Sequence, residues 1–146
     1  MTVIVLVQVL FTISILSFAL VAAAADLNRT HATNPVWVPH ARFHVVWQVA
    51  THIGIGLLAL VVLWAPVASL PVRFAIAGTI TGVVLGGFFV TAATMPLYGG
   101  ELADNNGYRP LTLDIAGRTR TLDQNVLLFA GGVGFLLLAG AVALTL

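Results

Sequence analysis

Four long apolar runs dominate the chain, and few polar residues interrupt any of them. They cover about residues 3–25, 39–64, 73–95 and 126–146. At a rise of about 1.5 Å per residue, a helix of about 20 residues crosses a bilayer hydrocarbon core of about 30 Å. The pattern therefore predicts an all-α integral membrane protein, a four-transmembrane-helix bundle in which residues 1–146 form a single domain.

Proline and alternating residues predict how these runs are connected. Pro39 suits the first position of the second helix, where a missing N–H costs nothing, and this helix is expected to stop before Pro66. The second and third runs are joined by a short connection, so their helices are expected to be antiparallel neighbours. In the third connection, PLTLDIAGRTRTL alternates apolar and polar residues around Ala116-Gly117, which predicts a short extramembrane β-hairpin.

Composition supports a lipid environment and excludes several kinds of site. Hydrophobic residues make up 60% of the chain and charged residues 8%, whereas about a quarter of an average soluble domain is charged. The net charge is +1, which excludes the broad basic surface of a nucleic-acid-binding protein. There is no cysteine, so disulfides and cysteine-ligated metals are excluded. The absence of lysine, with abundant Ala, Val, Leu and Gly, indicates a GC-rich bacterial genome.

The distribution of arginine predicts an orientation in the cell membrane. With four spans, both termini lie on one side and the two long polar segments on the other. Arg73 is the one arginine expected on the side of the termini, and the long segments carry the others: Arg29, Arg42, Arg109, Arg118 and Arg120. Basic loops stay in the cytoplasm, so both long polar loops are expected to be cytoplasmic and the termini outside.

Three of the arginines fall where the spans are expected to meet lipid headgroups. These are Arg29, Arg42 and Arg73. A planar guanidinium group suits a phosphate well. Membrane lipids are therefore the first expected partners, through ordinary anchoring at the headgroup level.

All four histidines lie between residues 31 and 52, and three of them share a spacing of four with a glutamine. His40, His44, Gln48 and His52 form a stripe along the second helix, about 18 Å long. Polar side chains at such depth are unfavourable when they face lipid. We therefore expect His44, Gln48 and His52 to form a buried polar stripe that faces the bundle interior, a cavity or another chain.

The histidines admit three interpretations. Two imidazoles four apart on a helix can bind one zinc or iron ion, so His40 and His44 are candidate metal ligands. A third ligand could come from His31 or from one of the acids: Asp26, Glu101 and Asp104. Alternatively, a neutral histidine beside an acid moves a proton on a hydrophobic substrate, or the imidazoles merely hydrogen-bond neighbouring helices. Beyond such an ion, no cofactor is predicted.

A row of glycines on the third helix predicts close helix packing. Gly78, Gly82 and Gly86 form a GxxxGxxxG pattern on one face. In lipid, helices associate through close backbone approach, which glycine permits. This helix-packing interface serves either a partner protein or another helix of the same chain.

Two resemblances bear on the chain. The block at residues 26–48, DLNRTHATNPVWVPHARFHVVWQ, is similar to uncharacterised small four-span membrane proteins of actinobacteria and fungi. The size, lysine-free composition and hairpin-capped layout resemble an accessory subunit of mycobacterial lipid importers of the mammalian-cell-entry type. The second resemblance implies a protein that binds a permease in the membrane and modulates its assembly or transport. Neither resemblance assigns a role to a residue.

These observations leave three hypotheses about function. The leading one is a non-enzymatic accessory subunit of a larger membrane complex in lipid transport, with larger integral membrane proteins as partners, because acids are missing from the interiors of the spans. The second is a small membrane enzyme that acts on a lipid or isoprenoid substrate, with His31, His40 and His44 as catalytic candidates. The third is a lipid-binding four-helix bundle.

Overall fold

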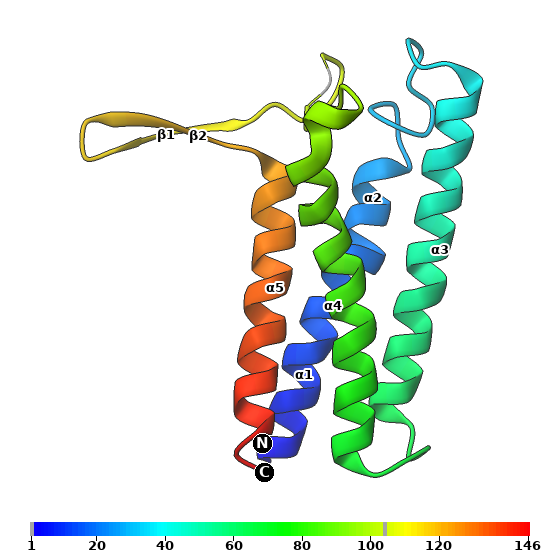
Figure 1. Ribbon diagram of the computed structural model, residues 1–146, viewed down its shortest axis with the longest axis vertical. Coiled ribbons are helices and arrows are strands. Elements are labelled where there is room, and N and C mark those ends of the chain that lie inside the picture. The colour runs from blue at the N-terminus through cyan, green and yellow to red at the C-terminus, as the bar shows by residue number, and fades with distance from the viewer. Residues whose placement is uncertain (1, 104) are drawn as a thin grey trace.

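The computed structural model describes residues 2–103 and 105–146, which form a bundle of long helices with one projecting hairpin (Figure 1). The first helical segment has three parts: α1 (Val3–Leu16), the π-helical turn η1 (Ser17–Val21) and α2 (Ala22–Asp26). The remaining elements follow in the order α3 (Pro39–Trp64), α4 (Leu70–Thr94), the 3₁₀ turn η2 (Met95–Leu97), β1 (Leu111–Ile115), β2 (Arg118–Leu122) and α5 (Gln124–Ala143).

The prediction of four membrane-length helices is confirmed. The segments that are long and apolar enough are Val3–Asp26, Pro39–Trp64, Leu70–Leu97 and Gln124–Ala143. The third begins earlier than expected because Pro71 sits in its first turn, where proline is tolerated. The last begins at Gln124 because the side chain of Asp123 caps it, accepting hydrogen bonds from two backbone N–H groups.

Large apolar side chains cover the outward faces of α3, α4 and α5. The exposed fraction is 62% for Phe43, 59% for Leu57, 69% for Val83 and 67% for Leu137. Helices that are apolar on their outer as well as their inner faces are typical of membrane spans. This surface is consistent with a bundle surrounded by lipid.

The first helical segment lies at the centre of the bundle and is its most buried part. It packs closely along α5, where the Ser14 hydroxyl donates to the backbone carbonyl of Gly132 over 2.7 Å. A Cβ at Gly132 would overlap the Ser17 hydroxyl, and a Cβ at Gly56 of α3 would overlap the Cβ of Ala19. These glycines therefore set how closely α5 and α3 approach the central helix.

Polar groups join three helices at the end of the bundle that carries the termini. Arg73 of α4 donates to the carbonyls of Val62 and Leu63, and Gln8 of α1 donates to the Leu63 carbonyl over 3.1 Å. Because α3 ends before Pro66, these carbonyls have no partner within their own helix. The structure thus corrects the prediction that Arg73 meets lipid headgroups: its side chain is buried, with 7% exposed, and neutralises the C-terminal end of α3.

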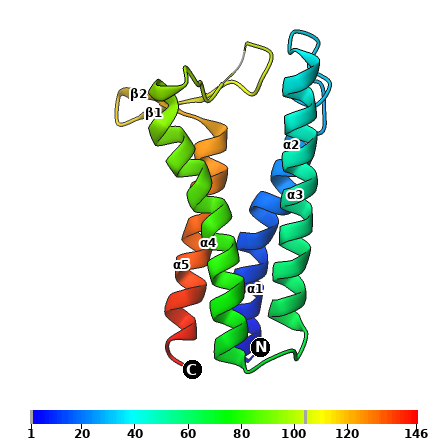
Figure 2. The same ribbon diagram turned by 45° about the vertical axis from the view of Figure 1, so that its right-hand side comes forward.

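The helices lie close together at the end with the termini and diverge toward the end with the long loops (Figure 2). At the first end, α3 and α4 are joined by a short connection and by Arg73. At the other end, the pair α4 and α5 leans away from α2 and α3. This divergence makes room for the cavity described below.

The predicted β-hairpin is confirmed, and it extends sideways from the bundle as an arm (Figure 1). Ala116 and Gly117 have positive φ angles of 52° and 71°, as the tight type I′ turn requires. All but one of the ten strand residues are exposed, and Leu122 at the base is partly buried.

The glycine row on α4 packs partly within the chain. A Cβ at Gly78 would lie 3.2 Å from the ring of Phe11 in α1, and one at Gly82 would lie 3.7 Å from Leu136 in α5. A Cβ at Gly86 would meet nothing within 4 Å. Two of the three positions therefore face neighbouring helices of the same chain.

The close approach of α3 to the central helix can be tested with two neighbouring glycines. We expect Gly56→Ala to lower the free energy of unfolding by about 1–3 kcal/mol, because the new methyl group overlaps a side chain that cannot rotate away. Gly54→Ala is the matched control, since a Cβ there meets nothing within 4 Å. Denaturant titration in detergent measures both, and equal effects would contradict the packing described.

Candidate functional site

A cavity of about 300 Å³ lies at the divergent end of the bundle. Its walls come from α2, α3, α4 and α5, and the two long loops contribute residues at its mouth. A volume of this size is at the lower end of small-molecule sites. A cavity of this volume has room for the head of an amphiphile or a short piece of a longer molecule.

The cavity gathers polar side chains that lie far apart in the sequence. Its apolar wall includes Phe88 and Phe129, which stack with ring centroids 4.2 Å apart and join α4 to α5. The polar lining comprises Asp26, His31, Gln48, His52, Thr91, Tyr98, Glu101 and Asn125. Two carboxyl groups and two imidazoles thus share one half-apolar pocket, which is the usual setting for binding or acid–base chemistry.

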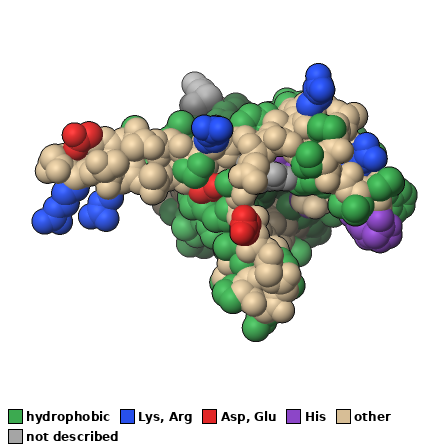
Figure 3. All heavy atoms as spheres, turned by 90° about the horizontal axis from the view of Figure 1, so that it is seen from above, with side chains coloured by type: hydrophobic (Ala, Val, Ile, Leu, Met, Phe, Trp, Pro, Cys, Tyr) green, Lys and Arg blue, Asp and Glu red, His purple; other side chains and the backbone are tan. Residues whose placement is uncertain are grey.

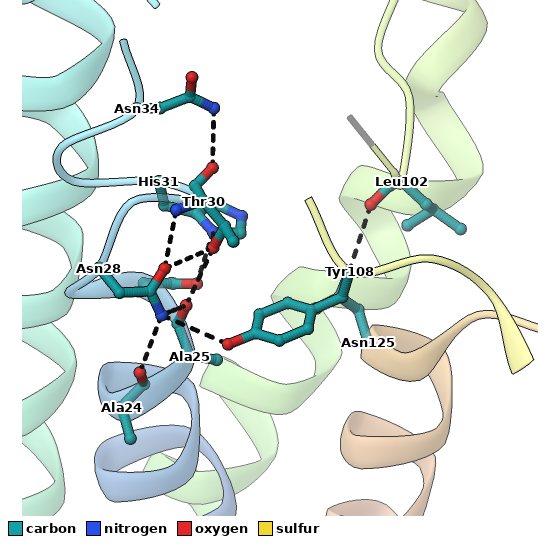
Figure 4. Close-up of polar contacts among 10 residues, drawn as sticks. Ala24, Ala25, Asn28, Thr30, His31, Asn34, Leu102, Tyr108 and Asn125 are labelled. Atoms are coloured by element: carbon teal, nitrogen blue, oxygen red, sulfur yellow. Dashed lines mark hydrogen bonds and ion pairs between the residues drawn. The ribbon is translucent and has the colours of Figure 1, made fainter. Parts of the chain in front are cut away.

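The loop between α2 and α3 is built around two asparagines, as Figure 4 shows for the first of them. The Asn28 amide nitrogen donates to the carbonyls of Ala24 and Ala25, while its oxygen accepts from the backbone N–H of Thr30 over 2.8 Å. Asn34 is fully buried and donates to the Thr30 carbonyl over 2.9 Å. These side chains replace regular backbone hydrogen bonds and hold the loop in one shape.

The hydrogen bonds of this network favour one tautomer of His31. The Thr30 hydroxyl donates its proton to the Asn28 side-chain oxygen over 2.7 Å, and the same hydroxyl oxygen lies 2.7 Å from His31 Nδ1. Because a hydroxyl has only one proton to give, Nδ1 must be the donor to Thr30. A neutral His31 therefore carries its lone pair on Nε2, the nitrogen suited to accept a proton from a bound molecule.

Asp26 lies beside one of the two imidazoles of the cavity. Its Oδ1 lies 3.8 Å from His31 Nδ1, and each of these side chains is 24% exposed. His52 of α3 lines the same cavity, and its ring meets the Phe18 ring edge-on at 6.1 Å between centroids. The carboxylate can balance a positive charge that develops on either imidazole.

The opposite wall is formed by the segment after α4 and by the start of α5. The Tyr98 hydroxyl donates to the Thr91 carbonyl over 2.8 Å, and the Asn125 amide donates to the Leu102 carbonyl over 3.2 Å. Asn28 also donates to the Tyr108 hydroxyl over 3.3 Å, which links the two long loops beside the cavity (Figure 4).

His40 and His44 are exposed on α3 and do not line the cavity. Their Nε2 atoms are 3.0 Å apart. The described residues contain no group of three or more His, Asp and Glu side chains that could hold a metal ion, so His31 does not complete a site with this pair. Asp104, another predicted third ligand, lies outside the described residues.

The predicted polar stripe is not buried along its length. His44 and Gln48 are exposed, although Gln48 lines the cavity, and His52 is half-buried. The reason is geometric: four residues turn a helix by about 400°, so each step moves the stripe about 40° around the axis. His40 and His44 consequently face outward and His52 faces the bundle.

The remaining predicted headgroup arginines lie at the loop end of the bundle. Arg29 is exposed in the loop after α2, and Arg42 is half-buried in the first turns of α3. Their contact with headgroups stays a prediction.

A second hollow, of about 890 Å³, lies near the termini and between α1, α4 and α5. Among the described residues that line it, Thr79 is the one with a polar side chain. This groove offers contact area to apolar chains and no chemistry, so the first cavity is the candidate site.

Comparison with known proteins places the chain in a family. Residues 12–112 match a family of unknown function, DUF6640. The chain belongs to the DUF6640 family. No curated protein and no solved structure matches it. The DUF6640 match contains Asp26, His31, His52 and Glu101, and it ends before the part of the cavity that α5 supplies.

Of the candidates named from the sequence, His31, Asp26 and Glu101 line the cavity, whereas the residues around them were not predicted. Asn28 and Thr30 fix the histidine, and Tyr98 and Asn125 complete the opposite wall. The first pair carries a usable signal, because an asparagine two residues before a threonine is the spacing of an Asx turn. Tyr98 and Asn125 carry none, since only packing of α4 and α5 brings them to the cavity.

The tautomer of His31 can be tested directly. We expect ¹⁵N NMR of histidine-labelled protein in bilayers at about pH 8 to show the Nδ1–H form at His31, with His31→Gln identifying its signal. Thr30→Val removes the acceptor and should shift the tautomer ratio toward Nε2–H about tenfold, the size of one hydrogen bond. An unchanged Nδ1–H form in Thr30→Val would contradict the assignment to Thr30.

Proposed function

We propose that this protein is an integral membrane enzyme that transfers protons on a lipid or isoprenoid substrate bound in the cavity at the divergent end. The observation that carries the proposal is the juxtaposition of His31 and Asp26 at 3.8 Å inside a half-apolar pocket. A histidine held in one tautomer beside a carboxylate is the usual arrangement of a general base. The enzyme, which was the second hypothesis from the sequence, is therefore placed ahead of the accessory subunit.

The proposed chemistry uses only groups that line the cavity. His31 Nε2 takes a proton from the substrate, and the Asp26 carboxylate balances the imidazolium charge. His31 then returns the proton to a different atom of the same substrate, which restores the neutral imidazole. The net reaction is an isomerisation, which needs no oxidant or other co-reactant. The stacked rings of Phe88 and Phe129 contact the apolar part of the substrate.

We further propose that the protein spans the cell membrane four times with both long loops in the cytoplasm. The long loops hold most of the arginines, and Arg73 is sequestered in the bundle. In this placement the cavity lies at the cytoplasmic membrane surface, where it can take an amphiphile from the lipid while its polar head remains near water.

A proton-transfer enzyme can be detected before its substrate is known. We expect purified protein, incubated with a membrane lipid extract in D₂O, to incorporate deuterium into a specific lipid that mass spectrometry identifies. His31→Gln should lower the rate of incorporation at least about 100-fold, since general acid–base catalysis contributes that much. His40→Gln is the matched control, because His40 lies at the same end of the bundle but does not line the cavity.

Two results would count against the enzyme. If no lipid gains deuterium above the protein-free blank, the proposed reaction is absent. If a defined lipid co-purifies without exchange, the cavity binds a ligand without transforming it, which is the third hypothesis from the sequence.

The accessory-subunit hypothesis has support from a different surface. His40, Phe43, His44 and Trp47 form a row of rings in mutual contact on the outer face of α3, and the exposed fractions of Phe43 and Trp47 are 62% and 59%. Imidazoles that face lipid are unfavourable. We propose that a larger integral membrane protein covers this row. The resemblance to an accessory subunit of lipid importers supports a role of that protein in lipid movement.

Photo-crosslinking tests for that partner. We expect a photoreactive residue at Trp47 to form an adduct with another membrane protein in native membranes. The same residue at Val83, exposed on α4, should react with lipid. Phe43→Ala should weaken the protein adduct severalfold, because aromatic anchors dominate interfaces. Lipid adducts alone at both positions would contradict a partner on α3.

A further inference from the structure

The hairpin arm is held at the level where helix α5 begins. Leu122, the last residue of β2, is followed by Asp123, the cap of α5. The arm extends sideways from this point, roughly across the helix axes (Figure 1). If α5 spans the bilayer, the arm lies over the lipid that surrounds the bundle, at the depth of the headgroups.

The two faces of the arm differ in chemistry. Residues paired across an antiparallel ladder share a face, and successive residues alternate between faces. One face carries the pairs Leu111–Leu122, Leu113–Arg120 and Ile115–Arg118, and the other carries Thr112–Thr121 and Asp114–Thr119. The first face therefore combines aliphatic side chains with two guanidinium groups, whereas the second is polar and has the only acid of the strands.

Nothing in the described chain covers the aliphatic face. The exposed fractions of Leu111, Leu113 and Ile115 are 43%, 42% and 55%. Figure 3, which looks down on the bundle, shows basic and acidic side chains on opposite lateral sides of the arm, so the arm rolls about its long axis to bring its basic side onto the membrane surface. The combination of exposed aliphatic groups and unpaired positive charge complements the boundary between acyl chains and anionic headgroups.

We propose that the hairpin arm docks on anionic phospholipids next to α5. Arg118 and Arg120 bind headgroup phosphates, and Leu111, Leu113 and Ile115 reach the underlying acyl chains. The arm thereby makes the protein sensitive to the lipid composition of its own membrane. This inference rests on the proposed membrane placement, and it is independent of the proposed chemistry in the cavity.

The cysteine-free chain allows a direct test, because a single introduced cysteine can be labelled cleanly. An environment-sensitive fluorophore is placed at Leu113→Cys on the aliphatic face or at Thr119→Cys on the polar face. Each protein is reconstituted in nanodiscs of phosphatidylcholine, with or without phosphatidylglycerol, that contain a headgroup-linked quencher. We expect strong quenching at position 113, weak quenching at 119, and a requirement for phosphatidylglycerol.

Removing the positive charges of the hairpin makes the test quantitative. Arg118→Gln combined with Arg120→Gln should lower the ratio of docked to free arm about 30-fold, because each of the two arginines contributes a similar share of the attraction to an anionic surface. Arg29→Gln, an exposed arginine in the other long loop, is the control and should leave the quenching unchanged.

The outcomes are distinguishable. Equal quenching at positions 113 and 119, or quenching that ignores phosphatidylglycerol, overturns the inference. If the fluorophore is unquenched in anionic nanodiscs but shielded from water in native membranes, a protein covers the arm, and this result also overturns the inference. Failure of the protein to insert into neutral nanodiscs would instead remove the membrane placement on which the inference rests.

Discussion

The arrangement of the helices depends on hydrogen bonds to the last carbonyl groups of α3. A helix that ends beside Pro66 leaves its final carbonyls without partners, and in an apolar bundle water cannot supply them. Arg73 from α4 and Gln8 from α1 fill this role at Leu63. One carbonyl thus ties three helices together, and the buried guanidinium group is compensated by the negative end of the α3 dipole.

With that end closed, the opposite end is free to open. The central helix contains a π-helical turn, Ser17–Val21, directly below the cavity, and such turns redirect a helix and are frequent at functional sites. Close contacts at Gly56 and Gly132 hold α3 and α5 against this region. Beyond these contacts the helices diverge, so the packed core and the cavity lie at different positions along the bundle axis.

The candidate site combines rigid and irregular parts in a way that suits proton transfer. His52 and the aromatic pair come from long helices, whereas His31 comes from a loop whose asparagines replace the missing backbone hydrogen bonds. The loop therefore presents an imidazole in a single tautomer without belonging to a helix. The aromatic row on α3 and the hairpin arm lie outside this site, and they are the surfaces proposed for a neighbouring protein and for lipid.

Apolar length, proline position and strand alternation were enough to predict four helices, both ends of α3 and the hairpin, because these signals act locally. The sequence also offered His31, Asp26 and Glu101 among the candidate site residues, and these three line the cavity. Which of the candidates share a site depends on the tertiary structure: His31, Asp26 and His52 line one cavity, while His40 and His44 turn outward. The reason is that a spacing of four drifts around a helix, so only packing against neighbours decides which residues face inward. Arg73 is buried for a related reason, because α3 packs beside α4 and presents the carbonyls of Val62 and Leu63 to it.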